Sequence, residues 1–361
     1  MRIGVLGGCG DMGSRAVEVL AERPEVEEVR VLDANAEAGR ALEQRFERVR
    51  FQAVDARDRA SLVAALAGLD AVASALGPFY LFERPLAEAA LEAGVPYVSL
   101  CDDHEAAKAV LELDAAAREK GIAIITGLGW TPGLTNLAAR RLYAELGGLE
   151  AVRIFWAGAS ADAKGHAVVL HTLYAFNGFV PRFVDGLFEW VPAGSAPEPV
   201  AFPPPVGTVL NYYLGHPEPV TLPRYLPVAR VELKGGLSEQ LLNSLGGVLA
   251  RLGLFRTHAR RERVSRLLKP LLPPLERLSP GVAASAWRVE GSHAGQRKAY
   301  WGAGRMRDLT GVPLALGALF LAEGRVERTG AFAPEAEGFP HMAFWEALEA
   351  YGVRAEAAPV D

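Results

Sequence analysis

The sequence predicts an α/β protein in which a doubly wound parallel sheet is followed by an α+β domain with a mixed sheet. Strand-like and helix-like segments alternate through the first 126 residues, which is typical of parallel sheets with helical crossovers. The pattern changes after Gly127, where strand-like segments joined by hairpin turn signals take over. The length of 361 residues also exceeds what one such domain needs, and therefore indicates two domains.

The first domain is expected to cover 1–130. Its strands are expected at 2–7, 27–33, 50–54, 70–76, 96–100 and 121–126, with helices between them at about 11–22, 36–47, 58–67, 81–93 and 103–119. Residues 69–76 and 122–126 are almost entirely apolar, as strands buried on both faces of a sheet are.

The second domain is expected to cover 131–304 and to bind substrate or form a dimer contact. Thr131 and Pro132 fit a helix N-cap and first helical position, and Asp185-Gly186 and Ala294-Gly295 are hairpin turn signals. Strands are expected at 150–157, 182–192, 206–213, 228–234, 284–292 and 296–303, with the prolines 203–205 as a rigid connector. These segments predict a mixed sheet.

Two helical regions complete the predicted plan. Residues 237–277 are expected to be an inserted helical pair, whose basic second part is either a solvated face or subunit contact, or a binding arm for an anionic partner. Helices expected at 309–323 and 340–351 return the chain to the first domain, so that about 305–361 complete it.

The turn after the first strand gives the strongest functional signal. Gly8, Gly10 and Gly13 form a G-x-G-x-x-G pattern that follows a strand and opens a helix. In Rossmann domains the first glycine permits the tight turn, the second admits a pyrophosphate to the backbone, and the third lets helix and strand pack closely. The helix N-terminus attracts the anion. The expected cofactor-binding residues of this turn are Gly8, Cys9, Gly10, Asp11, Met12 and Gly13.

An acid at the end of the second strand supports a dinucleotide site. Asp33 follows Gly13 by twenty residues, where a carboxylate accepts hydrogen bonds from the adenosine ribose. Because an acid repels a 2′-phosphate, NAD is favoured over NADP, although Arg40 lies close in sequence. The alternative is an ordinary turn with Asp33 as an N-cap. Further cofactor contacts are expected after the third and fourth strands, from Asp55 near the adenine and from Ala75, Leu76, Gly77 and Pro78.

Composition limits the remaining classes of function. The net charge of -5 argues against a nucleic-acid partner, and no apolar run is long enough to predict a membrane span. A strand that starts at residue 2 leaves no room for a signal peptide, and the two cysteines, Cys9 and Cys101, are too few for a disulfide scaffold. A cytoplasmic location is therefore expected. Without a Cys/His cluster, no metal site is expected.

Three segments carry a family resemblance: Gly77-Pro-Phe-Tyr80, Tyr97-Val-Ser-Leu-Cys-Asp-Asp103 and Gly127-Leu-Gly-Trp-Thr-Pro-Gly133. They resemble the saccharopine dehydrogenase-like family, which includes saccharopine reductases, lysine 6-dehydrogenases and carboxynorspermidine dehydrogenases. The resemblance implies a Rossmann domain, a mixed-sheet substrate domain, a homodimer, and hydride transfer between an amine-bearing carbon and nicotinamide. It also implies a substrate pocket lined by Tyr80, Asp102, Trp130 and the helix around Asn177.

The identity of a general base stays open between several residues. Amine oxidation needs an unprotonated nitrogen, so a carboxylate or imidazole must accept a proton. The candidates are Asp102, His171 and His166, while Lys164 and Lys234 could pair with a substrate carboxylate. His171, Tyr174 and Asn177 would share one face of a helix over 167–178, as a substrate wall or as polar contacts of an interface. The alternative for Asp102 and Asp103 is helix capping.

The function expected from the sequence is NAD-dependent oxidation of the C–N bond of an amino acid such as lysine or saccharopine. Two alternatives remain: a reductive condensing enzyme of polyamine synthesis, and a non-catalytic dinucleotide-binding regulatory protein.

Overall fold

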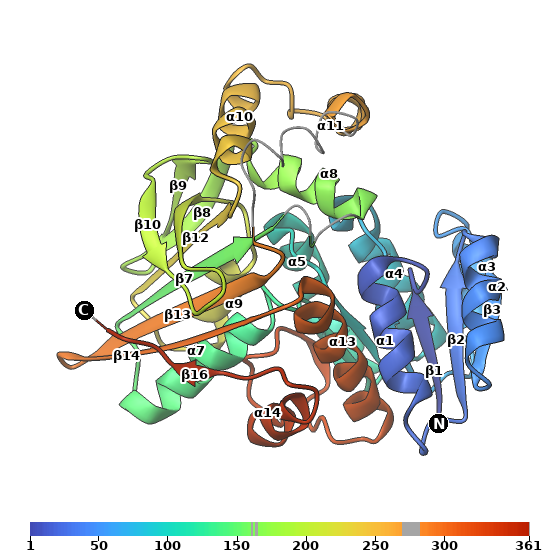
Figure 1. The fold of residues 1–361 in the computed structure, drawn as a ribbon. Coiled ribbons are helices and arrows are strands. Elements are labelled where there is room, and N and C mark those ends of the chain that lie inside the picture. Colours follow the sequence, from blue (N-terminus) through green and yellow to red (C-terminus); the bar gives the residue numbers. More distant parts are fainter. Residues whose placement is uncertain (160–161, 163–164, 269–281, 361) are drawn as a thin grey trace. The chain divides into compact units, whose positions relative to one another are not determined.

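The computed structural model describes residues 1–159, 162, 165–268 and 282–360. The chain forms two compact units (Figure 1). The first consists of Met1–Leu134 and Arg307–Gly352, and the second of Thr135–Met306 and Val353–Asp361. Within the described residues, no helix combines the length and apolar character that crossing a membrane requires.

A seven-stranded parallel sheet forms the centre of the first unit. Its strands are β1 (Arg2–Leu6), β2 (Glu28–Asp33), β3 (Val49–Ala53), β4 (Ala71–Ser74), β5 (Tyr97–Ser99), β6 (Ala123–Ile125) and β15 (Gly330–Phe332). The spatial order is β15-β6-β5-β4-β1-β2-β3, so the order reverses between β1 and β4. Ligands of such sheets bind beyond the carboxyl ends of the strands at this reversal.

Helices cover both faces of this sheet, as the α/β prediction requires. Those of the first unit are α1 (Asp11–Ala21), α2 (Ala36–Arg45), α3 (Arg59–Leu66), α4 (Phe79–Ala93), α5 (His104–Leu111), α6 (Asp114–Glu119), α13 (Met306–Ala322) and α14 (His341–Glu349). A buried cluster joins α3, α4, α5 and α6 to one face, with the fully buried Tyr97 among its strand residues. On α13, a Cβ at Gly317 would lie 2.5 Å from the Leu128 side chain and 3.3 Å from that of Val98, so that helix packs tightly on the unit.

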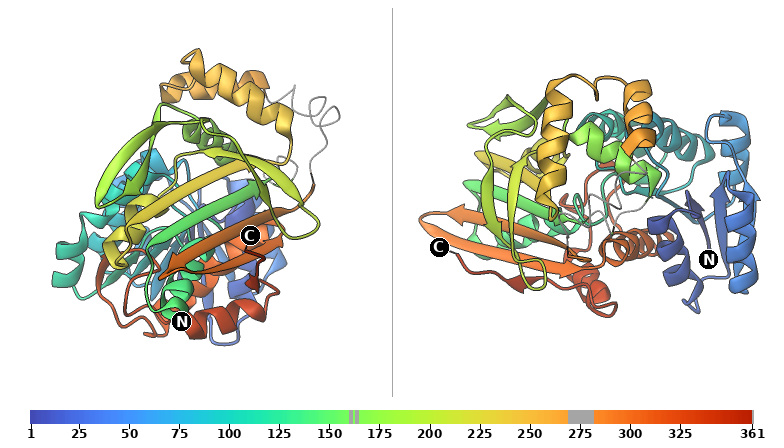
Figure 2. Two further views of the ribbon diagram at one scale, coloured as in Figure 1. Left: turned by 90° about the vertical axis from the view of Figure 1, so that its left-hand side faces the viewer. Right: turned by 45° about the horizontal axis from the view of Figure 1, so that its top comes forward.

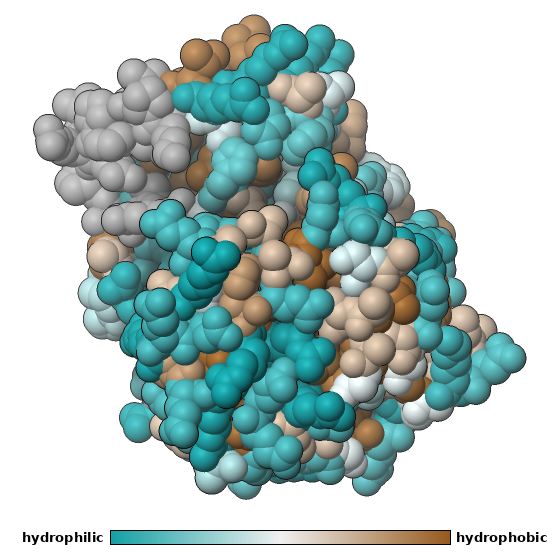
Figure 3. All heavy atoms as spheres, turned by 90° about the vertical axis from the view of Figure 1, so that its right-hand side faces the viewer, coloured by the Kyte–Doolittle hydropathy of each residue, from teal (hydrophilic) through white to brown (hydrophobic). Residues whose placement is uncertain are grey.

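The outer side of the first unit is rich in charge. Figure 3 views the side of Figure 1 on which β3, α2 and α3 lie, and hydrophilic side chains (teal) cover much of it. Arg59 on α3 pairs with Glu88 and Glu92 on α4, at 3.2 and 2.9 Å. Such exposed pairs contribute little to stability, so the apolar cluster beneath α3 and α4 is what holds them.

The second unit contains a nine-stranded mixed sheet, seen face-on at the left of Figure 2. Its strands are β7 (Ala151–Gly158), β8 (Phe179–Val184), β9 (Leu187–Pro192), β10 (Glu198–Ala201), β11 (Thr208–Tyr213), β12 (Arg230–Leu237), β13 (Ser285–His293), β14 (Gln296–Gly304) and β16 (Glu356–Ala357). The pair β7–β12 is parallel and the other pairs are antiparallel. Its helices are α7 (Leu134–Leu146), α8 (His166–Ala175), α9 (Glu218–Tyr225), α10 (Gln240–Arg251) and α11 (His258–Leu268).

Turn residues set the register of two hairpins as predicted. Asp185 and Gly186, with φ of 50° and 84°, join β8 to β9. Ala294 and Gly295, with φ of 48° and 77°, join β13 to β14. Positive φ at both central residues matches the twist of the flanking strands.

Several predicted boundaries were wrong. Helix α7 begins at Leu134 rather than Pro132, because Gly133 has a φ of 127° and the Leu134 N–H donates to the Gly129 carbonyl. Helix α8 ends at Ala175, which leaves Asn177 beyond it. Strands β10, β15 and β16, which are two to four residues long, were not predicted from the sequence.

The C-terminal segment divides between the two units. Residues 307–352 join the first unit, through β15 beside β6. The last residues were also expected there, but β16 pairs with β14 and belongs to the second sheet. Of the predicted insertion 237–277, α10 and α11 are helical, and 269–277 lie outside the described residues.

The buried Trp287 on β13 provides a test of the second unit. Its side chain is fully buried, whereas that of Trp190 on β9 is 55% exposed. Trp287→Ala is expected to lower the free energy of unfolding by about 3–5 kcal/mol, because it leaves a large cavity. Leu252→Ala, at a 69% exposed position directly after α10 and outside the β8–β9 hairpin, is the control and is expected to cost less than about 1 kcal/mol. Urea unfolding of both variants tests this, and equal losses would contradict the buried position of Trp287.

Candidate active site

The glycine turn between β1 and α1 is built around the carbonyl of Gly7. The Gly10 N–H donates to this carbonyl at 3.0 Å, and a Cβ at Gly13 would lie only 2.2 Å from the same oxygen. Gly13 therefore lets α1 pack against the end of β1, as predicted. The tight turn, however, falls at Gly7, which has a φ of 70°, rather than at Gly8. Gly8 instead packs beneath the Val31 and Val17 side chains.

The N-terminus of α1 is open to an anionic ligand. The N-cap residue is Gly10, which has no side chain to bond the N–H groups of the first turn. Gly10 is exposed, with a Cβ position that meets only the Gly7 carbonyl, at 3.3 Å. Asp11 is also exposed, and Met12 is half-buried. Unpaired N–H groups of a first turn, together with the helix dipole, form a site for a phosphate.

The carboxylate of Asp33 is fixed beside this turn. The Cys9 N–H donates to Asp33 Oδ2 at 3.0 Å, and the Asn35 N–H donates to Oδ1 at 2.9 Å. Each oxygen keeps a further lone pair that can accept a ribose hydroxyl. Burial and the Asp33 charge raise the pKa of the Cys9 thiol to about 12, so Cys9 is no thiolate nucleophile.

Asp55, which was expected to contact the adenine, is paired with the side chain of Arg57. Its exposed carboxylate accepts two bonds from the Arg57 guanidinium, at 2.9 and 2.8 Å. These bonds lower the pKa of Asp55 to about 2. An adenine at the end of β3 would therefore meet an Asp55–Arg57 ion pair.

The segment after β4 passes very close to the glycine turn. A Cβ at Gly7 would lie 2.9 Å from backbone atoms of Ala75 and Leu76. The Ala75 N–H donates to the Leu6 carbonyl at 2.9 Å, and Gly77 and Pro78 follow with a cis peptide bond. Small residues are needed here because two backbones meet.

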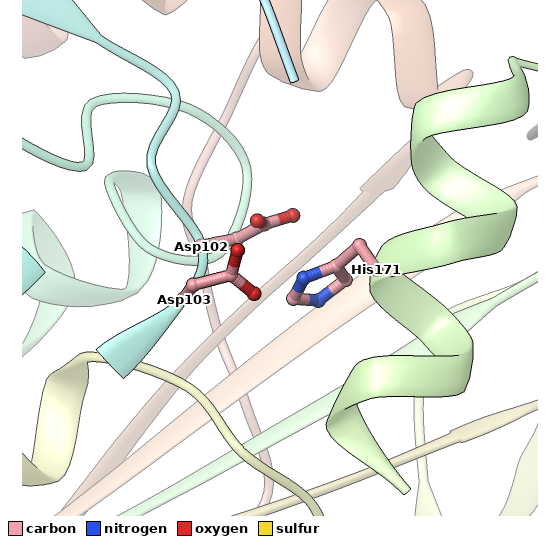
Figure 4. A group of neighbouring side chains, drawn as sticks. All are labelled: Asp102, Asp103 and His171. Atoms are coloured by element: carbon pink, nitrogen blue, oxygen red, sulfur yellow. The ribbon is translucent and has the colours of Figure 1, made fainter. Parts of the chain in front are cut away.

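The two aspartates after β5 have different surroundings (Figure 4). Asp103 is fully buried, and its carboxylate accepts the Tyr80 N–H at 2.8 Å in the first turn of α4. Helix capping is therefore the role of Asp103, although the helix that it caps is α4. Asp102 is half-buried.

The segments after β5 and β6 are held together. The Leu128 N–H donates to the Ser99 carbonyl at 2.7 Å, and a Cβ at Gly127 would lie 3.2 Å from the Cys101 carbonyl. Trp130 lies in the second of these segments and is 7% exposed. Cys101 is fully buried, and burial raises the pKa of its thiol well above the ordinary value.

A buried carboxyl group, which the sequence interpretation missed, lies under these segments. Glu83 of α4 is fully buried and accepts hydrogen bonds from Tyr97, Ser99 and Thr126, at 3.1, 2.5 and 3.3 Å. Burial raises the pKa of Glu83 to about 7, although the three hydroxyls favour its ionised form and oppose that rise. In the sequence, its signal is an acid that directly follows four aromatic or apolar residues, 79–82.

In the second unit, His171 and Tyr174 lie on α8 (His171 is drawn in Figure 4), and Asn177 follows the helix. The predicted face of three polar residues is therefore shortened to two. The Arg261 guanidinium of α11 lies over the Tyr174 ring, 5.1 Å from its centroid.

Two other candidate residues are engaged in ion pairs. His166 Nε2 lies 3.1 Å from Glu262 Oε1, and the histidine side chain is 57% exposed, unlike a desolvated base. Lys234 Nζ donates to Glu198 Oε2 at 2.8 Å, and the same carboxylate also accepts from Arg153 at 2.6 and 2.7 Å. Lys164 lies outside the described residues.

A buried polar cluster of the second unit was also missed. Glu218 is fully buried and accepts a bond from Thr135 at 2.8 Å, and its other oxygen lies 3.8 Å from His216 Nδ1. The ring of His216 meets that of His171 edge-on, with centroids 5.2 Å apart. His171 thus belongs to a chain of ionisable groups. The His-Pro-Glu sequence just before a helix was its only local signal.

The order of the first sheet and the geometry of its glycine turn define a dinucleotide-binding domain of the Rossmann type. Residues 3–125 match the family model of the saccharopine dehydrogenase NADP binding domain. These residues are therefore similar to that domain of the saccharopine dehydrogenase-like family, as the resemblance predicted. A nicotinamide dinucleotide is the cofactor that this domain supports.

Comparison with solved structures extends the similarity of fold to the whole chain. The structure matches apo saccharopine dehydrogenase (L-Glu forming) from Saccharomyces cerevisiae over 99% of this chain and 100% of that one, with a TM-score of 0.71 and 16% identity. A probable dehydrogenase from Thermotoga maritima matches over 99% and 98%, with a TM-score of 0.46 and 12% identity. GenD2 from gentamicin A biosynthesis, in complex with NAD, matches over 100% and 97%, with a TM-score of 0.44 and 17% identity.

Gly13→Ala tests the dinucleotide site. The added Cβ would overlap the Gly7 carbonyl and displace α1, so we expect the affinity for NAD(H) to fall at least about tenfold. Gly247→Ala on α10 is the matched control, because among the described residues no atom beyond its chain neighbours and its own helix backbone lies within 4 Å of its Cβ position. Calorimetric titration measures both, with circular dichroism to check folding. Unchanged affinity in a folded Gly13→Ala protein would contradict the site.

The pKa of Glu83 predicts a pH dependence of stability. Because the folded protein holds the Glu83 proton up to about pH 7 and the unfolded chain loses it near 4.5, stability falls as pH rises through that window. Between pH 5 and 8, the wild type is expected to lose about 2–3 kcal/mol more than Glu83→Gln. Urea unfolding at both pH values measures the difference. Glu92→Gln, an exposed position on the same helix, should follow the wild type, and parallel profiles for all three proteins would refute the assignment.

Proposed function

We propose that this protein is an NAD(P)-dependent dehydrogenase that oxidises the C–N bond of an amino acid such as lysine or saccharopine. The observation that supports it most directly is the glycine turn, with an open α1 N-terminus and a carboxylate fixed beside it. The family model over 3–125 and the fold shared with a saccharopine dehydrogenase support the same class of enzyme.

The proposal favours NAD over NADP. Both oxygens of Asp33 are oriented by backbone N–H groups, and an oriented carboxylate suits ribose hydroxyls and repels a 2′-phosphate. Arg57 would favour a phosphate, but its guanidinium is paired with Asp55.

The protein's own residues would bind the substrate and accept one proton from it. A bound dinucleotide supplies the hydride acceptor. Asp102 is proposed as the group that accepts the proton of the substrate ammonium, since Asp103 is occupied in capping α4. His171 is the alternative base, supported by its contact with the His216–Glu218 pair. Substrate contacts are proposed for Tyr80, Trp130, Tyr174 and Asn177.

We further propose a cytoplasmic homodimer. Its support is a set of exposed apolar side chains on the β8–β9 hairpin: Phe179, Leu187, Phe188 and Trp190, which are 63, 70, 49 and 55% exposed. Patches of this kind are typical of subunit contacts.

Reduction of NAD and of NADP, followed against lysine, saccharopine, other amino acids and diamines, tests the function. Turnover is expected with NAD and with lysine or saccharopine. Asp102→Asn should lower kcat about a hundredfold or more if Asp102 is the base, and His171→Asn should do so if His171 is. Asp185→Asn, at an exposed hairpin turn with a φ of 50°, is the control that should keep full activity.

Each other outcome has a defined meaning. Unchanged turnover in Asp102→Asn would remove Asp102 from the mechanism. Dinucleotide binding without turnover of any substrate would favour the condensing reductase or the non-catalytic binder, and absence of binding would refute the proposal.

A further inference from the structure

The network around Glu83 lies at the edge of the sheet where a dinucleotide is expected. Its donors are Tyr97 and Ser99 in β5 and Thr126 directly after β6. The glycine turn would hold the pyrophosphate and Asp33 the adenosine, on the side of β2. The nicotinamide half therefore falls on the opposite side of the reversal, where β4, β5 and β6 end.

Glu83 is the group of this network suited to exchange a proton near neutral pH. Its hydroxyl partners solvate the ionised form, while burial opposes it, and the pKa is about 7. Among the described residues, Asp103 is a charged neighbour whose negative charge also raises the pKa of Glu83. The titratable neighbours Tyr97 and Cys101 have pKa values raised well above their ordinary ones, so both are neutral in this range.

We propose that Glu83 is a proton-exchanging group coupled to the redox state of the bound dinucleotide. The oxidised nicotinamide carries a positive charge that favours the Glu83 carboxylate. The reduced ring is neutral, so Glu83 then takes up one proton from solvent. Buried charges interact strongly because the protein interior screens them less than water does. This inference rests on the dinucleotide binding in the proposed function, and it assigns Glu83 a role in setting the relative affinity for the two cofactor forms.

Binding of NAD and NADH measured from pH 6 to 8.5 by calorimetry tests the coupling without turnover. In the wild type, the affinity for NAD relative to NADH is expected to rise about fivefold or more as Glu83 ionises. In Glu83→Gln, the ratio should be independent of pH. The glutamine can accept from Ser99 and Thr126 and donate to Tyr97, so the fold should tolerate it.

Two controls separate Glu83 from other titrating groups. ADP-ribose lacks the nicotinamide, so its affinity should not distinguish Glu83→Gln from the wild type at any pH. Thr126→Val removes one donor to the ionised carboxylate, and should move the midpoint of the NAD/NADH ratio to higher pH. Infrared difference spectra provide a second readout, because the band of a protonated carboxyl group should appear with NADH and be missing in Glu83→Gln.

A ratio that is flat in the wild type, or that titrates equally in Glu83→Gln, would overturn the inference while leaving the proposed function intact. Failure of the wild type to bind either NAD or NADH would overturn both.

Discussion

The contact of α1 with the Gly7 carbonyl is the constraint on which the dinucleotide site depends. Because no side chain fits at Gly13, the helix begins directly above the turn and its first N–H groups lie at the carboxyl edge of the sheet. Backbone hydrogen bonds then connect one strand end to the next along that edge: Gly7 to Leu32, Ala75 to Leu6, Leu100 to Ser74 and Leu128 to Ser99. These bonds tie the strand ends to one another at the edge where a dinucleotide is expected.

Buried acids hold the segments beyond this edge. Asp103 joins the segment after β5 to the start of α4, and Glu83 joins α4 to β5 and to Thr126 after β6. A buried carboxylate without partners would cost several kcal/mol, so each is stable only because N–H or O–H groups surround it. The same bonds make these segments depend on one another.

The second unit uses its charges differently. Lys234 and Arg153 share the carboxylate of Glu198, and His166 lies 3.1 Å from a carboxylate oxygen of Glu262. A different group of ionisable side chains lies around the half-buried His171: its ring meets that of His216, which lies 3.8 Å from the carboxylate of Glu218. His171 therefore lies beside a histidine and a buried acid, whereas His166, the other histidine candidate for the base, is exposed. This difference explains why His171 remains a candidate base although the predicted face including Asn177 does not exist.

The sequence by itself determined the strands of both sheets other than β10, β15 and β16, the glycine turn, the acid at the end of β2 and the two hairpins. Each of these depends on residues close together in the chain: apolar runs, a glycine spacing, or an Asp-Gly turn. Only the tertiary structure decided which polar groups meet. Glu83 binds Thr126 across 43 positions, and Thr135 binds Glu218 across 83. Such partners are chosen by the order of strands and helices in space, which leaves no trace in local spacing. For the same reason, the sequence could name Asp102, Asp103 and Lys234 as candidates. It could not tell whether each of them caps a helix, forms an ion pair or acts on a substrate.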